Sequence, residues 1–175
     1  WGGYADWAPE AVFVMAEWDT LTNQWQMIDG PDGNAFGGGV FHDASSIFIA
    51  ASCWDSTNNR VLFTNGEGLW AYNPSGTINA RTTLLRSDAG LVSSLGNSHM
   101  VFDSTRNHAL LLGAPTANTF IEFDFSGGTT NSPLKSVKNI TGTPWPTNSS
   151  SSGLGFGPGA LFDPISDRYI VWTGG

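Results

Sequence analysis

Phe162-Asp163-Pro164-Ile165-Ser166-Asp167-Arg168, followed by the apolar run from Tyr169 to Trp172, is the stretch that decides the fold. The same order of residue types occurs twice more: an aromatic residue, an Asp, a polar turn, then a basic or His residue before an apolar run. The other copies are Trp54-Asp55-Ser56-Thr57-Asn58-Asn59-Arg60 before Val61, and Phe102-Asp103-Ser104-Thr105-Arg106-Asn107-His108 before Ala109. The three copies begin at residues 54, 102 and 162. Recurrence of one unit at such intervals is typical of proteins built from repeated supersecondary units.

Each copy predicts a β-hairpin. The Asp side chain can accept hydrogen bonds from backbone amides of the turn, and Asn, Ser and Pro suit its tight backbone. The apolar runs on either side then pair as antiparallel strands. The repeat therefore indicates a protein made of short hairpins.

A second motif follows the hairpins and ends in an aromatic residue before Asp or Asn. It predicts third strands at Val12 to Asp19, Leu69 to Pro74 and Phe120 to Asp124. Fourth strands are expected over residues 23–28, 78–85 and 133–137. The repeating unit is thus a four-stranded antiparallel sheet.

The composition supports an all-β fold. The chain has 22 Gly and 9 Pro in 175 residues, and 13% of its residues are aromatic. Gly and Pro favour turns, while aromatic and β-branched residues suit pleated strands. No long segment keeps a helical apolar period free of Gly, which argues against helices. A β-sandwich is the competing all-β reading, but it does not require the same turn and third-strand ending three times.

The chain resembles kelch-like β-propellers of the galactose oxidase central-domain type. The resemblance is carried by Phe162-Asp163-Pro164 with the following Trp172-Thr173-Gly174-Gly175, and by Trp18-Asp19-Thr20 with the following Trp25. The middle repeats depart from it, because Asn65-Gly66 and Gly113-Ala114 stand in place of the double glycine. The resemblance implies that each four-stranded sheet is one propeller blade.

Three blades' worth of strands follow in circular register, as a single partial propeller domain over residues 1–175. Residues 1–28 supply strands three and four of a split blade, 29–85 and 86–140 one blade each, and 141–175 strands one and two of the split blade. Propellers typically close with four to eight blades, so three cannot close alone. The expected partner is a second copy, or a remaining propeller segment, that completes the ring.

Charge and cysteine content narrow the function classes. The net charge is −8, without any cluster of Lys and Arg, which disfavours nucleic acid as a partner. No apolar run approaches the roughly 20 residues of a membrane span. The one cysteine, Cys53, reads as a small buried hydrophobe. Low charge and sequons at Asn139 and Asn148 fit an extracellular, cell-surface or virion-surface setting.

Candidate ligand-binding residues lie in the loops between second and third strands, and at the start of an innermost strand: Asp6, Trp7, Glu10, Glu67 and His99. An exposed Trp can stack on a sugar ring while neighbouring carboxylates accept hydroxyl protons. The alternative is that the acids are solvated loop residues and that Trp7 packs beneath the rim. His99 is expected either to line the central channel of the propeller, or to lie buried or at its rim with its hydrogen bonds satisfied.

No cofactor or metal is expected. His42, His99 and His108 lack metal-ligand spacing, and Cys53 has no evident tyrosine partner for galactose oxidase-like copper chemistry. Signature motifs of serine hydrolases, zinc proteases and phosphate-binding loops are missing. The sequence therefore favours a non-catalytic module recognising protein or glycan. The alternative is a polysaccharide lyase or hydrolase that uses the loop carboxylates and His99.

Overall fold

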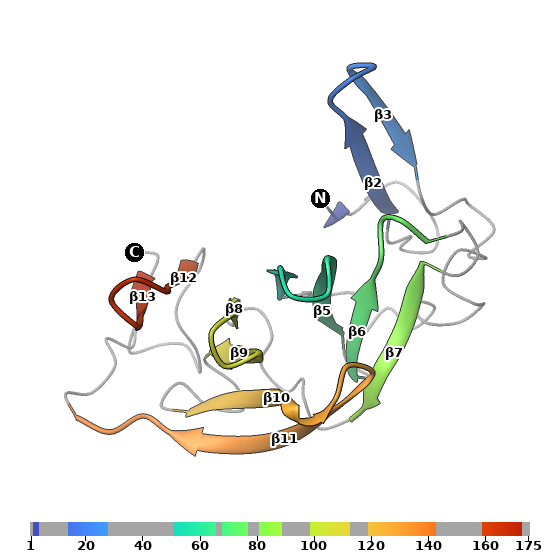
Figure 1. The fold of residues 1–175 in the computed structure, drawn as a ribbon. Coiled ribbons are helices and arrows are strands. Elements are labelled where there is room, and N and C mark those ends of the chain that lie inside the picture. Colours follow the sequence, from blue (N-terminus) through green and yellow to red (C-terminus); the bar gives the residue numbers. More distant parts are fainter. Residues whose placement is uncertain are drawn as a thin grey trace.

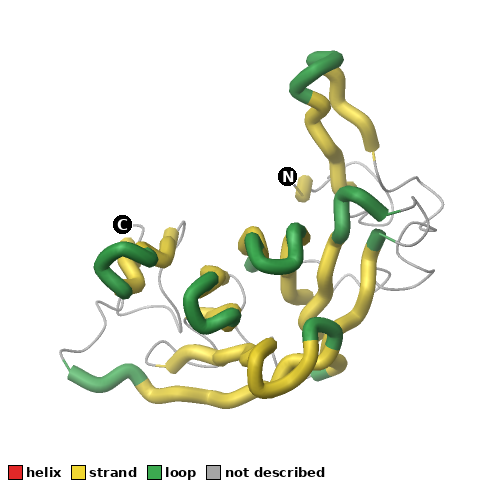
Figure 2. The backbone as a smooth tube through the Cα atoms, in the orientation of Figure 1, coloured by secondary structure: helices red, strands yellow, loops and turns green. Residues whose placement is uncertain are grey.

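The computed structural model describes residues 2–3, 14–27, 51–65, 68–76, 81–88, 99–112, 119–142 and 159–172. Throughout these residues the backbone forms strands and their connecting turns, as Figure 2 shows. The described part of the chain contains no helix, and so none long and apolar enough to span a membrane. The predicted all-β class is confirmed.

Thirteen strands form four antiparallel sheets in the described residues. The complete sheets are β4–β7 and β8–β11, each with its strands in sequential order, and the smaller ones are β1–β3 and β12–β13. The strands are β1 (Gly2–Gly3), β2 (Val14–Asp19), β3 (Gln24–Met27), β4 (Ser52–Asp55), β5 (Arg60–Asn65), β6 (Gly68–Tyr72), β7 (Thr82–Ser87), β8 (His99–Asp103), β9 (His108–Leu112), β10 (Thr119–Thr129), β11 (Ser132–Asn139), β12 (Gly159–Asp163) and β13 (Arg168–Trp172).

Four hairpins share one turn geometry. In each, an Asp carboxylate accepts a hydrogen bond from the backbone N–H two residues later, at 2.8–3.1 Å, for Asp19, Asp55, Asp103 and Asp163. The residue four positions after each Asp has a positive φ, between 53° and 58°, at Asn23, Asn59, Asn107 and Asp167. Asn and Asp tolerate this left-handed conformation better than other non-glycine residues. The repeated sequence motif therefore encodes a repeated turn.

The predicted hairpins and third strands are confirmed, although some strand boundaries differ from the predicted ones. β7 begins at Thr82, later than the predicted residue 78, and β10 continues to Thr129 through an irregularity in its pairing with β11. Pro133 lies inside β11, where it is tolerated because β11 is the edge strand of its sheet. Gly2 and Gly3 form a short additional strand that pairs with Met15 and Val14 of β2.

The two complete sheets pack face to face. Their shared apolar cluster contains Leu62, Leu69 and Ala71 from the first sheet, and Met100, Leu111 and Phe123 from the second. Cys53 packs against this cluster, and desolvation raises the pKa of its thiol, as expected for a small hydrophobe. Inner strand β4 contacts β8 and outer strand β7 contacts β11, so the sheets stack in the same orientation.

The sheet β12–β13 packs on the opposite face of β8–β11. Ala160, Phe162 and Val171 contact a cluster formed by Val101, Leu110 and Leu112. Figure 1 shows the sheets following one another along an open arc, with β7 and β11 on its outer side. The described strands form several separate sheets and no closed ring.

Candidate functional site

Four of the five residues predicted to bind ligand, Asp6, Trp7, Glu10 and Glu67, lie outside the described residues. The fifth, His99, begins β8 and pairs with Leu112 of β9. The structure therefore gives a location to one predicted site residue.

His99 lies at the seam between two sheets. It is partly buried, and it forms a hydrogen bond with the backbone of Ala160 in β12. Burial lowers the pKa of its imidazole, and this outweighs the opposite effect of the hydrogen bond. The neutral imidazole is thereby favoured, which suits a hydrogen-bonding role between β8 and β12.

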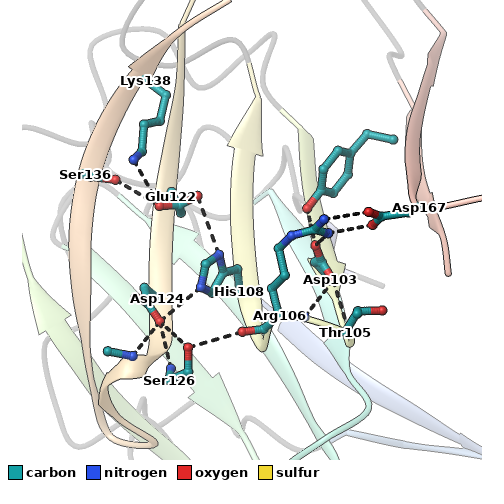
Figure 3. Close-up of polar contacts among 12 residues, drawn as sticks. Asp103, Thr105, Arg106, His108, Glu122, Asp124, Ser126, Ser136, Lys138 and Asp167 are labelled. Carbon is teal, nitrogen blue, oxygen red and sulfur yellow. Dashed lines mark hydrogen bonds and ion pairs between the residues drawn. The ribbon is translucent and has the colours of Figure 1, made fainter.

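A polar cluster lies on the same face of β8–β11, farther along β9, β10 and β11 (Figure 3). His108 Nε2 is 3.1 Å from Asp124 Oδ1, and His108 Nδ1 is 3.5 Å from Glu122 Oε2. The second oxygen of Glu122 accepts a hydrogen bond from Ser136 Oγ at 3.2 Å, and lies 3.5 Å from Lys138 Nζ. One histidine thus bridges two carboxylates that lie two residues apart on the same face of β10.

Asp124 is the best-anchored carboxylate of this cluster. It accepts hydrogen bonds from the backbone N–H of Gly127 at 2.6 Å and from that of Ser126 at 2.8 Å, which hold the carboxylate in the turn that follows. The Gly127 hydrogen bond is the largest cause of a lowered pKa at Asp124, and His108 adds to it. Within the described ranges, no group of three or more His, Cys, Asp or Glu residues is placed to hold a metal ion. The contacts that the structure shows for this cluster are hydrogen bonds and ion pairs among its own residues.

A second network joins β8–β11 to the last hairpin. Arg106 Nη1 lies 2.8 Å from Asp103 and 2.7 Å from Asp167, while its Nη2 donates to Asp167 at 2.7 Å. The Tyr169 hydroxyl donates to the buried Asp103 carboxylate. Desolvation and that hydrogen bond raise the pKa of Tyr169. Although burial opposes it, the pKa of Asp103 is lowered by its hydrogen bonds from Tyr169 and Arg106.

A third arrangement was not predicted from the sequence. A cavity of about 220 Å³ opens among the turns of β4–β5, β6–β7 and β10–β11. Two arginines, Arg60 and Arg81, line it together with the amides Asn58, Asn73 and Asn131. Arg60 belongs to the repeated turn motif, but its approach to residues seventy positions later is a tertiary contact that the motif does not encode.

Comparisons with known proteins give no relative: no family model matches the chain, and no curated protein or solved structure matches it. The kelch-like resemblance therefore rests on the repeat itself.

Proposed function

We propose that this chain is a non-catalytic binding or assembly module, built as part of a kelch-like β-propeller whose open ends are completed by another sheet of the same kind. The proposal places it in a secreted, cell-surface or virion-surface protein that recognises protein or glycan. The observation that carries it is a difference in solvent exposure between side chains at equivalent positions of successive repeats.

Successive sheets bury the same positions, except at the end of the series. Aligned on the Asp turns, Val101, Leu110 and Leu112 of β8–β9 correspond to Leu161, Ile170 and Trp172 of β12–β13. The first three are at most 5% exposed, because β12–β13 covers them. Their counterparts are 43%, 49% and 52% exposed. Large apolar side chains grouped on one face favour a partner there.

The first complete sheet, β4–β7, also has an exposed aromatic side chain, on the face that points away from β8–β11. Trp54 of β4 corresponds to Phe102 of β8, which is buried against the preceding sheet. Trp54 is 45% exposed. A sheet like β12–β13 placed before β4 would cover Trp54 with its Leu161, Ile170 and Trp172 face. The two exposed faces are therefore the two sides of one missing interface.

Strand number supports the same proposal. β12–β13 has two strands, whereas β4–β7 and β8–β11 have four each, and β2–β3 has the pattern of a third and fourth strand. In the complete sheet, Val61 of β5 pairs with Tyr72 of β6. The equivalent register pairs Tyr169 of β13 with Trp18 of β2. Because β1 already occupies Val14 and Met15, this pairing either stops at the middle of β2 or displaces β1.

The completing sheet comes from a second copy or from a further propeller segment. In a preparation of this chain alone, a second copy is the one available source. Multi-angle light scattering with size-exclusion chromatography tests this, because Ile170→Glu places a charge on the exposed face. We expect a dimer for the unmodified chain and a monomer for the variant. An unmodified monomer would assign completion to a further segment instead.

A further inference from the structure

An ion pair joins the outer strands of the two complete sheets. Asp88, directly after β7, accepts a hydrogen bond from Lys135 Nζ of β11, and its Oδ2 lies 3.9 Å from Arg86 Nε. Arg86 Nη1 also donates to the Pro133 carbonyl at 3.2 Å. The end of one outer strand is thus held to the start of the next by a carboxylate between two cations.

The end of β11 has the counterparts of Arg86 and Asp88. The third strands β6 and β10 align on their final aromatic residues, and their pairing with the fourth strands makes Lys138 the counterpart of Arg86. Two residues later, Ile140 stands where the first sheet has Asp88. The cation is therefore kept at this end of the series, and the carboxylate is replaced by an apolar side chain.

The β2–β3 hairpin has the counterpart of Lys135. Trp18 pairs with Trp25 across β2 and β3, as Phe123 pairs with Lys135 across β10 and β11. The two Trp rings are in contact, with centroids 5.0 Å apart, and 42% of Trp18 and 59% of Trp25 are exposed. An exposed aromatic side chain thus replaces the Lys of the ion pair.

Both members of the ion pair are replaced together. Asp88 faces Lys135 as a pair of charges, whereas the counterparts Ile140 and Trp25 form an apolar pair. Replacement of only one member would leave a charge buried against an apolar side chain, which is unfavourable. Lys138 fits the same arrangement, because an ammonium group beside a Trp ring gains a cation–π interaction.

Trp18 shows a second complementary change. Its counterpart Phe123 is fully buried, in the apolar cluster between the complete sheets that also contains Ala71. The counterpart of Ala71 on β10 is Glu122, because each lies directly before the last aromatic residue of its third strand. Trp in place of Phe adds an N–H donor, and Glu in place of Ala adds an acceptor. Buried Trp N–H groups usually find such a partner.

We propose that the β2–β3 hairpin of a second copy packs on the outer half of β8–β11, with Trp25 against Ile140 and Lys138 and with Trp18 at Glu122. This inference rests on the proposed completion by a second copy, and it names the surface that receives the hairpin. β12–β13 already covers the inner strands β8 and β9 on this face. The hairpin extends the same covering outward, over the side chains drawn on β10 and β11 in Figure 3.

An exchange of the two residue pairs tests the contact. Trp25→Lys together with Ile140→Asp rebuilds the ion pair that Lys135 and Asp88 form between the complete sheets. Sedimentation velocity gives the dissociation constant of the dimer. We expect each single change to weaken the dimer about tenfold or more, and the double variant to return to within about threefold of the unmodified chain. Recovery by a second substitution also shows that the single variants are folded.

Val137→Asp combined with Trp25→Lys is the matched control. Val137 lies on the same strand as Ile140 but on the opposite face, because it pairs with the core residue Ile121. We expect this combination to dimerise no better than Trp25→Lys alone.

The outcomes separate this contact from self-completion as such. A dimer that neither single change weakens, or that Ile140→Asp rescues no better than Val137→Asp does, overturns the assigned contact and leaves completion by a second copy standing. A monomeric unmodified chain overturns both.

Discussion

The guanidinium of Arg106 and the carboxylate of Asp167 face each other in parallel, with two nitrogen–oxygen distances of 2.7 Å (Figure 3). Arg106 belongs to the turn after β8, and Asp167 to the turn after β12. Asp167 also has a positive φ of 54°, so the turn geometry itself presents its carboxylate. The repeated turns therefore shape single hairpins and also connect one sheet to the next.

Loss of this connection is expected to loosen the last hairpin. Arg106→Gln removes both hydrogen bonds to Asp167 while the apolar contacts of Phe162 and Val171 remain. We predict faster amide hydrogen exchange in β12 and β13, with unchanged exchange in β5 and β6, because the latter strands belong to another sheet. Uniform acceleration in all four strands would show that Arg106 acts on global stability instead.

The buried pair Asp55–Arg60 is expected to carry far more stability. Both side chains are almost fully buried, and Asp55 also accepts hydrogen bonds from Thr57 and Asn58. Asp55→Asn leaves the Arg60 charge without its carboxylate, which typically costs about 3–5 kcal/mol of unfolding free energy. Chemical denaturation gives the value. Asp19→Asn makes the same change in the equivalent turn of another hairpin, where the Asp is exposed, and is the control. Equal losses of unfolding free energy in both variants would contradict a special contribution from the buried pair.

Thr64 offers a stabilising change. Its hydroxyl is buried and has no hydrogen-bond partner among the described residues. Its neighbours Leu62 and Leu69 are apolar and offer none. Thr64→Val keeps the shape and removes the unsatisfied group. We expect a gain of about 1 kcal/mol in unfolding free energy. The exposed Thr83→Val should change it little, and a destabilised Thr64→Val would reveal a hydrogen bond to this hydroxyl.

The lowered pKa of His99 leads us to expect that the stability of the protein depends on pH. Because its pKa is lowered in the folded protein, the unfolded chain binds the proton more readily. Its contribution is complete above the unfolded pKa of about 6.5 and is lost as pH falls through the lower folded value. Urea unfolding at pH 7.5 and pH 5.5 should show a smaller acid loss for His99→Gln, which can still donate to Ala160. An identical acid loss in both proteins would assign it to other groups.

How much of the molecule the sequence predicts depends on the range of the interactions. Asp55, Asp103 and Asp163 bond within their own turns, so the hairpins follow from local motifs. The bond from Arg60 to Thr130 joins residues from different repeats, and no local pattern encodes it. The same holds for the cavity, because Thr130 and Asn131 reach it from the second complete sheet. Of the predicted site, His99 alone lies in the described residues, so the loop carboxylates remain a prediction.

The register of the missing interface gives a further expectation. If β13 pairs with β2 of a second copy as β5 pairs with β6, Ile170 lies opposite Glu17. In a Cys53→Ser background, Ile170→Cys with Glu17→Cys should form a covalent dimer under mild oxidation. Ile170→Cys with Gln24→Cys is the out-of-register control. Equal crosslinking of both pairs would indicate nonspecific contact.

Self-completion of the propeller is tested most directly by the native mass of the purified chain, because a second copy should cover the face of Leu161, Ile170 and Trp172. Native mass spectrometry should give twice the 18.6 kDa of one chain, and Ile170→Glu should return it to a single copy. A single copy in the unmodified protein, with Trp54 and Trp172 still open to solvent, would contradict self-completion of the propeller.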